Sequence, residues 1–484
     1  MAFAITQTCC ADASCVSVCP VNCIHPTPDE PDFGHTDMLY VDPETCIDCG
    51  ACADACPVDA IFPAGALTGP LRAYEDINAE YYAGRDVLAS VAPNFHQWAP
   101  PSFTRILPSD FTPLDVAVVG SGPAGMYAVE DLLLHTNSRV TLIDRLPVPG
   151  GLIRYGVAPD HPSTKKIGET FARFRDHPRL RLRLGVHAGP ELAGRHDAVI
   201  YAVGATEARR LGVPGEDLPG SLPAATVVGW YNGHPDVAAV DLSAERVVVV
   251  GAGNVALDIA RILTADPDSL AGTSIAPAVL ERLRSCKVRE VVVLARHGPE
   301  TAAYTRPELL ALAARGGLVV DAHDSRIAAA VDAATAGEKA ALLRGVPREA
   351  IDWSAPPPDG TRRVVLRFHS APIAFRGDTE VRGVVVSGPV GDVEIAAGRV
   401  VRAAGFRGAP VPGLPFDEDT GTVPNVAGRV APGTYVAGWI KRGPAGGIGA
   451  NKTCARETVG TLLEDAVAGR LPLRRKGKRL LGRA

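Results

Sequence analysis

The apolar positions of this chain twice form the same pattern of a short apolar strand, a glycine turn and an amphipathic helix. The first unit begins with VAVVGSGPAG at residues 116–125, and the second is RVVVVGAGNVALDIARIL at residues 246–263. A further apolar strand follows each unit, RVTLID ending at Asp144 and VVVLAR at residues 291–296. Two such units predict two α/β domains, each built to bind a dinucleotide.

Length and composition are consistent with a globular chain of several domains. The 484 residues correspond to roughly three domains at about 150 residues each. The net charge is -5, yet residues 1–71 contain ten acidic side chains and no lysine or arginine, so the remainder is slightly basic. No basic domain is apparent, and we therefore expect no nucleic-acid partner.

The sequence also argues against a membrane protein and an exported protein. It contains no run of about 18 uncharged apolar residues, so no membrane span is expected. The start, MAFAITQTCC, lacks a basic segment followed by an apolar stretch, which excludes a signal peptide and predicts a cytoplasmic protein. In that compartment, the nine cysteines within the first 56 residues indicate metal or redox ligands rather than disulfides.

The second half of the cysteine-rich region carries the bacterial ferredoxin spacing. Cys46, Cys49, Cys52 and Cys56 follow the pattern C-x2-C-x2-C-x3-C, with Pro57 next. In that pattern three cysteines bind one iron–sulfur cluster and the fourth binds the other cluster. Soft thiolates are the ligands that such clusters require. A zinc knuckle or unligated buried cysteines is the alternative interpretation.

The first half departs from the pattern at one position. Counting back from Cys19 gives Cys15, then Asp12 where a cysteine is expected, then Cys9. If the fourth cysteine of each run binds the cluster of the other run, two sites are predicted. One is a [4Fe–4S] site with four thiolates from Cys19, Cys46, Cys49 and Cys52. The other has three thiolates, from Cys9, Cys15 and Cys56.

About 60 residues of this region resemble the bacterial seven-iron ferredoxins. The resemblance implies a [3Fe–4S] cluster at the three-thiolate site. Two alternatives remain open. In the first, Asp12 binds a fourth iron and the cluster is a second [4Fe–4S] cluster. In the second, Cys10 replaces Cys9 as a ligand. The resemblance also implies that Cys23 packs beside a cluster without binding it.

The first glycine turn fits the G-x-G-x-x-G dinucleotide motif between a strand and a helix. Its glycines allow a tight turn and close approach of a pyrophosphate to a helix N-terminus. Asp144 ends the next strand, where an acidic residue hydrogen-bonds the adenosine ribose. The motif alone is weak, and a plain strand–turn–helix is the alternative.

Three further segments resemble the adrenodoxin-reductase-like ferredoxin–NADP reductases. They are PVPGGLIRYGVAPDHPSTKK (147–166), WYNGHP (230–235) and GWIKRGPAGGIGANKTCARETV (438–459), so the resemblance covers roughly residues 113–460. It implies FAD at the first turn, with the last segment closing over the flavin. The implied FAD positions are Gly120, Gly122, Pro123, Ala124, Gly125, Asp144, Leu152, Trp439, Gly446, Gly447 and Ile448.

The second glycine turn fits G-x-G-x-x-A and is expected to bind NADP(H) through Gly251, Gly253, Asn254, Val255 and Ala256. Arg296 ends the next strand, where a guanidinium suits the 2′-phosphate of NADP(H). His297 follows where the family usually has a second arginine, which puts the strength of the NADPH preference in doubt. A solvated strand-end charge is the alternative for Arg296. The resemblance also places Glu308 and Gly446 at the nicotinamide dinucleotide.

The resemblance identifies His161 and Asp258 as paired polar residues near the flavin. They would act as proton or orientation partners in catalysis. A structural hydrogen bond is the alternative, because hydride transfer between cofactors needs no side-chain acid or base.

These patterns together predict the architecture. We expect a small α+β two-cluster ferredoxin domain (1–65), a linker or wrap (66–112), and two Rossmann-like three-layer α/β domains. The FAD domain (113–204 and 406–484, ending in a basic tail) would hold an inserted NADP domain (205–405).

The expected activity is that of a ferredoxin–NADP(+) reductase. NADPH would reduce FAD, and FAD would pass single electrons to the iron–sulfur clusters of the chain and to an external ferredoxin, a cytochrome P450 system or another acceptor. Two alternatives are an electron-transfer subunit of a glutamate-synthase-like complex and a carrier with a vestigial NADP site.

Overall fold

The computed structural model describes residues 2–472, except 86–104, 106, 190, 191, 193, 336, 361 and 390. Most of the expected linker and the basic tail from residue 473 onward therefore lie outside the described residues. Among the described helices, none is long and apolar enough to cross a membrane.

The first Rossmann domain is built on a six-stranded sheet with the order β21-β22-β8-β5-β6-β7, in which only β21 runs antiparallel to its neighbour. Its strands are β5 (Asp115–Val119), β6 (Arg139–Asp144), β7 (Leu180–Leu184), β8 (Ala198–Tyr201), β21 (Arg429–Ala431) and β22 (Thr434–Val436). Its helices are α3 (Pro123–His135), α4 (Leu152–Tyr155), α5 (Pro162–Lys165), α6 (Ile167–Ala172), α12 (Trp439–Arg442) and α13 (Ile448–Val467). The chain leaves this sheet after β8 and returns to it at β21, with α13 packed against α3.

The second Rossmann domain lies between these two passages. Its parallel seven-stranded sheet has the order β10-β19-β11-β12-β15-β13-β14, with strands β10 (Ser221–Pro223), β11 (Arg246–Val250), β12 (Glu290–Leu294), β13 (Leu318–Asp321), β14 (Arg348–Glu349), β15 (Arg363–Arg367) and β19 (Arg399–Arg402). Its helices are α7 (Ala224–Tyr231), α8 (Asn254–Thr264), α9 (Pro277–Arg284), α10 (Arg306–Ala313) and α11 (Ser325–Ala333). An antiparallel sheet of β16 (Ala371–Arg376), β17 (Gly383–Ser387) and β18 (Val393–Ala396) covers one face. The chain passes from the first domain to the second and later returns, and these two connecting segments pair as the antiparallel strands β9 (Glu207–Ala208) and β20 (Phe406–Arg407).

The N-terminal module (residues 2–85) contains two short antiparallel strand pairs. Strand β1 (Phe3–Ile5) pairs with β4 (Ile61–Pro63), and β2 (Ile24–His25) pairs with β3 (Tyr40–Val41). The short helix α1 (Ala51–Ala55) lies between β3 and β4 in the sequence, and α2 (Ala73–Tyr82) follows β4.

The structure differs here from the expected boundary at residue 65, because α2 is an integral part of the module. The buried Asn78 side chain accepts hydrogen bonds from the main-chain amides of Ile5 (3.1 Å) and Val41 (2.8 Å). A polar residue at the buried position of a ten-residue helix gives no apolar periodicity, so the sequence pattern did not reveal it.

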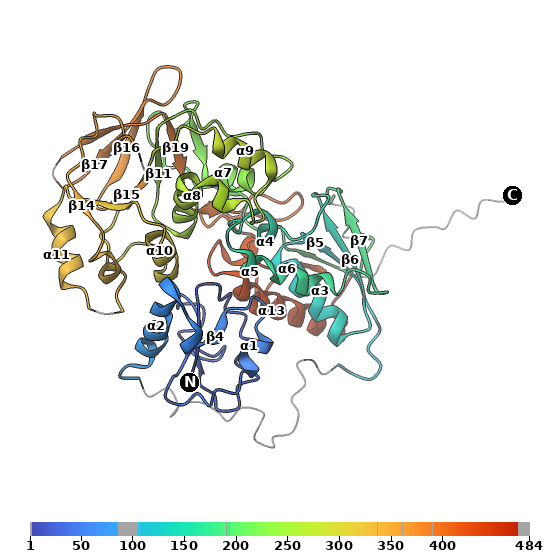
Figure 1. The fold of residues 1–484 in the computed structure, drawn as a ribbon. Helices are drawn as coiled ribbons and strands as arrows, with labels where there is room; N and C mark the ends of the chain where they lie inside the picture. Colours follow the sequence, from blue (N-terminus) through green and yellow to red (C-terminus); the bar gives the residue numbers. More distant parts are fainter. Residues whose placement is uncertain are drawn as a thin grey trace.

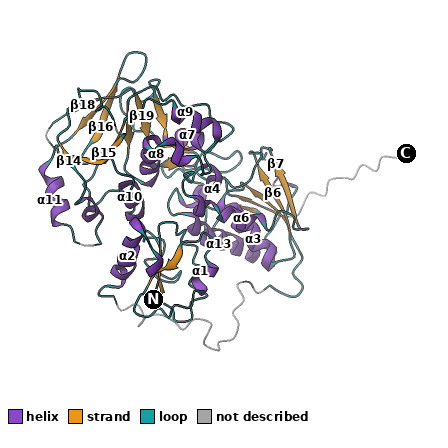
Figure 2. Ribbon diagram, viewed as in Figure 1, coloured by secondary structure: helices purple, strands orange, loops and turns teal. Residues whose placement is uncertain are grey.

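The N-terminal module lies beneath both Rossmann domains, with α2 below α10 and the cysteine-rich part beside α13 (Figure 1). Helices flank the sheets of both Rossmann domains (Figure 2). Apolar residues of the module and of the first Rossmann domain form one continuous core. The predicted fold class is therefore confirmed: two Rossmann-like domains, one inserted in the other, preceded by a small α+β module.

Candidate functional site

The first glycine turn lies between β5 and α3, where β5 and β6 end side by side. Gly120 has a φ of 102°, and a Cβ there would lie 2.4 Å from the carbonyl oxygen of Ala202. A Cβ on Gly125 would lie 1.9 Å from the carbonyl oxygen of Gly120. Only glycine fits at either position, so the turn brings backbone amides to the start of α3.

Two later segments converge on this turn. A Cβ on Gly151, directly before Leu152, would lie 2.7 Å from the Cα of Gly122. A Cβ on Gly438, directly before Trp439, would lie 2.6 Å from the Cβ of Ala124. The glycines thus form a narrow cradle of bare backbone, which fits the flat rings and pyrophosphate of a flavin dinucleotide.

The remaining expected flavin positions line the same region. Leu152 is 44% exposed at the start of α4, so its side chain is available to a ligand. The indole Nε1 of Trp439 donates to the carbonyl of Gly446 (3.3 Å), which joins α12 to the segment before α13. Gly447 is the N-cap of α13 and Ile448 its first residue.

Asp144 holds the glycine turn in place. Its Oδ2 accepts from the Ser121 amide (2.7 Å) and hydroxyl (2.5 Å), while Oδ1 accepts from the Leu146 amide (2.8 Å). Both oxygens thus have protein partners at the end of β6. The expected contact with a ribose stays a prediction.

The second glycine turn, between β11 and α8, has the same construction. Gly251 has a φ of 115°, and a Cβ there would lie 2.5 Å from the carbonyl oxygen of Ala403. Gly253 caps α8, and nothing lies within 4 Å of a Cβ built on it, so the turn is open to a ligand. Asn254 accepts a hydrogen bond from the Thr305 amide (2.8 Å), and Ala256 is fully buried against the core, with Val255 between them.

Arg296 and His297 follow β12, and both are exposed. The Nε of Arg296 donates to the Nε2 of His297 (3.3 Å), so the two side chains lie together beyond the strand. This is the edge of the sheet where a dinucleotide places its adenosine ribose. The arrangement leaves the guanidinium free to meet a phosphate from solvent.

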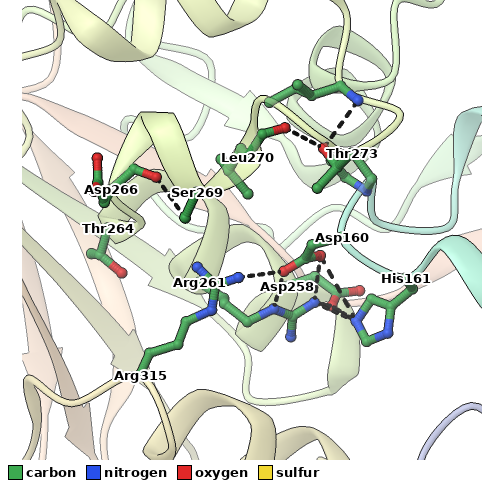
Figure 3. A network of polar contacts seen from close by, with 12 residues as sticks. Asp160, His161, Asp258, Arg261, Thr264, Asp266, Ser269, Leu270, Thr273 and Arg315 are labelled. Atoms are coloured by element: carbon green, nitrogen blue, oxygen red, sulfur yellow. Dashed lines mark hydrogen bonds and ion pairs between the residues drawn. The ribbon is translucent and has the colours of Figure 1, made fainter.

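A buried guanidinium, not anticipated from the sequence, organises the contact between the two Rossmann domains (Figure 3). Arg261 on α8 is 2% exposed and pairs with Asp160 (2.8 Å), Asp258 (2.6 Å) and Glu308 (2.9 Å). Arg315 also donates to Asp160 (2.9 Å). Glu308, expected at the nicotinamide dinucleotide, therefore lies in this network.

His161 lies at the edge of the same network. Its Nε2 contacts the guanidinium of Arg261 and is 3.5 Å from Asp258 and 3.7 Å from Glu308. Burial opposes protonation, but the hydrogen bond to Asp258 and the charge of Glu308 outweigh it, and the pKa of His161 is raised. A neutral ring accepts from Arg261, whereas a protonated ring donates to a carboxylate. For the Glu308 carboxyl, burial acts in the opposite direction and raises the pKa.

His161, Asp258 and Glu308 have donor atoms close enough to hold a metal ion. Arg261 already supplies the positive charge between these carboxylates, so we assign no metal to them. The sequence offered one signal for Arg261, namely that it follows Asp258 by three positions on a largely apolar helix.

The eleven cysteines form no disulfide, and those of the N-terminal module gather around two hollows. The four-cysteine site is lined by Cys19, Cys46, Cys49 and Cys52, together with Cys23, Phe3, Val21, Ile47 and Gly50. The three-cysteine site is lined by Cys9, Cys15 and Cys56, together with Cys10, Asp12 and apolar residues. The cysteines that the sequence pattern assigns to one cluster therefore line the same hollow in the structure. Thiol groups in this arrangement fit iron–sulfur clusters.

Cys23 lies directly beside a ligand position. Its Sγ is 3.4 Å from the Sγ of Cys19. The hydrogen bond from Cys23 lowers the pKa of Cys19 to about 6 and raises the pKa of Cys23 itself. The pair therefore favours Cys19 as thiolate and Cys23 as thiol.

In the three-cysteine site, burial raises the pKa of Cys9 to about 11 and that of Cys15 well above its ordinary value. Cys10 is also buried and lines the hollow, so the structure keeps it near enough to compete with Cys9. A bound iron would itself deprotonate these thiols.

The Asp12 carboxylate makes protein contacts of its own. Oδ1 accepts from the Ser14 amide (3.3 Å), Oδ2 accepts from the Ser14 hydroxyl, and Lys452 Nζ lies 3.6 Å from Oδ2. These partners compete with iron for the carboxylate oxygens.

Two dinucleotide-type glycine turns, a glycine cradle and two groups of thiols together define a class. The chain is a flavin- and pyridine-nucleotide-dependent oxidoreductase with an attached iron–sulfur module. Comparisons with known proteins agree with this class. The family model described as pyridine nucleotide-disulphide oxidoreductase matches residues 114–296, and the 4Fe-4S binding domain matches residues 39–62.

Individual relatives define the family more narrowly. The chain is 47% identical, over an alignment 494 positions long, to a probable ferredoxin/ferredoxin--NADP reductase of Mycobacterium bovis, covering 97% of this chain and 85% of the relative. It is 45% identical to the NADPH-ferredoxin reductase FprA of Mycobacterium tuberculosis, over 73% of this chain and 84% of that one. The solved structure of that FprA in complex with NADPH superposes with a TM-score of 0.67 at 42% identity, covering 75% of this chain and 87% of the other. The chain belongs to the ferredoxin/ferredoxin–NADP reductase family.

Proposed function

We propose that this chain is an NADPH-dependent reductase that passes electrons through FAD to iron–sulfur clusters in its own N-terminal module, and from there to an external acceptor. The observation that supports this most directly is the joining of three parts in one chain: the glycine cradle, the open second turn and the module whose cysteines converge on two hollows. Ferredoxin and cytochrome P450 systems are the first acceptors to test.

The residues of the chain bind and orient, while the cofactors carry the redox chemistry. Bound FAD would take a hydride from NADPH and release its electrons singly. The glycines at 120, 122 and 125 admit the flavin pyrophosphate, and those at 251 and 253 admit that of NADPH. We assign Arg296 to the 2′-phosphate, with His297 beside it.

The Arg261 network positions the two Rossmann domains against each other. Asp160 and His161 come from the first domain, whereas Asp258, Arg261 and Glu308 come from the second. His161 can hold or release a proton at Nε2 within this network, so we propose His161 and Asp258 as the polar pair beside the flavin.

The test is steady-state reduction of ferricyanide and cytochrome c by the purified holoprotein, with NADPH and with NADH. We expect turnover with both acceptors and a higher kcat/KM for NADPH. Flavin and iron content of the same sample would establish which cofactors are bound. Negligible turnover with both nucleotides would contradict the reductase function and favour a carrier with a vestigial NADP site.

A further inference from the structure

One edge of the N-terminal module meets the first Rossmann domain at the start of α13. The amide of Gly449 donates to the carbonyl of Cys10 (2.9 Å). A Cβ on Gly449 would lie 2.0 Å from the carbonyl oxygen of Ala11, so only glycine permits this approach. The loop of the three-cysteine site is therefore in direct contact with α13.

This contact lies next to the proposed flavin site. Helix α13 begins directly after Gly446 and Gly447, which belong to the segment expected to close over the flavin. Tyr127, on the helix that follows the first glycine turn, belongs to the apolar core that also contains cysteines of both sites. Its buried hydroxyl has no hydrogen-bond partner among the described residues. The loop of the three-cysteine site thus meets α13 within a few residues of the flavin-closing Gly446 and Gly447.

The four-cysteine site has a different setting, because part of it faces solvent. Cys49 is exposed, and the neighbouring Ile47 is 57% exposed although it is a large apolar side chain. Glu44 and Asp48 are also exposed in this short stretch. We call the surface formed by Glu44, Ile47, Asp48 and Cys49 the exit face.

As an extension that rests on the function proposed above, we propose that electrons cross the module in one order. They enter at the three-cysteine site from the reductase and leave at the four-cysteine site through the exit face. The occupant of that face is a one-electron redox protein with a basic surface. Residues 1–71 contain ten acidic side chains and no lysine or arginine, which attracts a basic partner and repels an acidic one.

The redox balance of this route is simple. Oxidation of one NADPH to NADP+ and a proton supplies two electrons, which cross the module one at a time. Each electron reduces one acceptor molecule, so two acceptor molecules are reduced for each NADPH. No atom is transferred to the acceptor, and the exit face therefore needs only a close and complementary contact.

The exit face can be tested with Ile47→Arg in the full-length holoprotein. The new charge should repel cytochrome c, a basic protein, and lower its kcat/KM by about ten-fold or more. The control is Val426→Arg, because Val426 is 73% exposed on the first Rossmann domain and should tolerate the change. EPR of the reduced four-iron cluster would verify that the site itself is intact. Unchanged cytochrome c kinetics with an intact cluster would overturn the assignment of the exit face.

The entry edge can be tested with Gly449→Ala, which forces Ala11 away from α13. After rapid mixing with NADPH, cluster reduction should slow several-fold relative to flavin bleaching in the same variant. Lys452→Met is a gentler second variant, because it removes only the contacts that the Lys452 ammonium makes with Asp12 and Ser14 at the same edge. Glu80→Gln is the control, since it loosens the contact with Arg306 on the opposite side of the module.

The outcomes separate the two proposals. Failure of NADPH to bleach the flavin of the wild-type protein would contradict the proposed function. Normal bleaching together with wild-type cluster reduction in both entry-edge variants would leave that function intact and overturn the order of electron transfer. An equal slowing of cluster reduction in Glu80→Gln would also overturn the proposed order of electron transfer, because the effect would not be specific to the entry edge.

Discussion

The ammonium group of Lys452, on the first turns of α13, lies 3.6 Å from the carboxylate of Asp12 and donates to the main-chain carbonyl of the same residue (3.2 Å). Asp12 stands where the ferredoxin pattern has its second cysteine. The residue that interrupts the cluster motif therefore also joins the N-terminal module to the helix that begins beside the flavin-closing segment. Its contacts with Lys452 and Ser14 favour this role over iron ligation.

The first prediction concerns the number of iron atoms at the three-cysteine site. Asp12→Cys restores the missing thiolate, so the iron content should rise by one atom per chain, and the EPR signal of an oxidised three-iron cluster should disappear. The control, Asp12→Asn, removes the charge without adding a thiol and should keep the signal. Eight irons per wild-type chain would show instead that Asp12 or Cys10 already binds the fourth iron.

The second prediction separates Cys23 from the ligand Cys19. The Cys23 Sγ lies 3.4 Å from the Cys19 Sγ. Cys23→Ser should retain the four-iron cluster, because the serine hydroxyl keeps a hydrogen-bond donor beside the Cys19 sulfur. Cys19→Ser should lose that cluster, since it removes one of the four thiolates. Iron analysis and the visible absorption of the two variants provide the measurement. Loss of the cluster in Cys23→Ser alone would make Cys23 the ligand.

The third prediction concerns nucleotide selection. Arg296→Ala should raise the KM for NADPH by roughly ten-fold or more, because a hydrogen bond to a charged group contributes about 1.5–3 kcal/mol. The KM for NADH, which has no 2′-phosphate, should change little. Steady-state ferricyanide reduction with each nucleotide measures both values. Equal increases for the two nucleotides would show that Arg296 does not contact the 2′-phosphate.

The features that the sequence predicted are those encoded by local spacing. The glycine turns, the strand before each turn and the grouping of cysteines all follow from residues that are close together or regularly spaced. Arg261 was missed because its partner Asp160 is 101 positions away, and only the fold brings the two together. Helix α2 was missed for the same reason, since Asn78 is a polar residue whose hydrogen-bond partners include the distant backbone of Ile5 and Val41.

The fourth prediction concerns the stability that Arg261 provides. Arg261→Met keeps much of the side-chain volume but leaves the carboxylates of Asp160, Asp258 and Glu308 without their buried cation. The free energy of unfolding should fall by about 3–5 kcal/mol, as measured by urea denaturation. Arg284→Met is the matched control, because its ion pairs lie at the surface, and it should leave the free energy of unfolding nearly unchanged. Similar losses in the two variants would contradict a special role for the buried network.

The fifth prediction gives the sign of a pH effect at His161. The ring faces Asp160, Asp258 and Glu308 as well as Arg261, and the carboxylates outweigh burial and the arginine in raising its pKa. A raised pKa in the folded state stabilises the fold at pH values below the ordinary imidazole pKa of 6.5, and this contribution is lost as pH rises through the higher folded value. His161→Gln should therefore destabilise the holoprotein more at acidic than at alkaline pH, as measured by urea denaturation at both. In an Asp258→Asn background the difference should shrink, because one of the groups that raise the pKa is neutral. A larger cost of His161→Gln at alkaline pH would show that the folded protein instead favours the neutral ring.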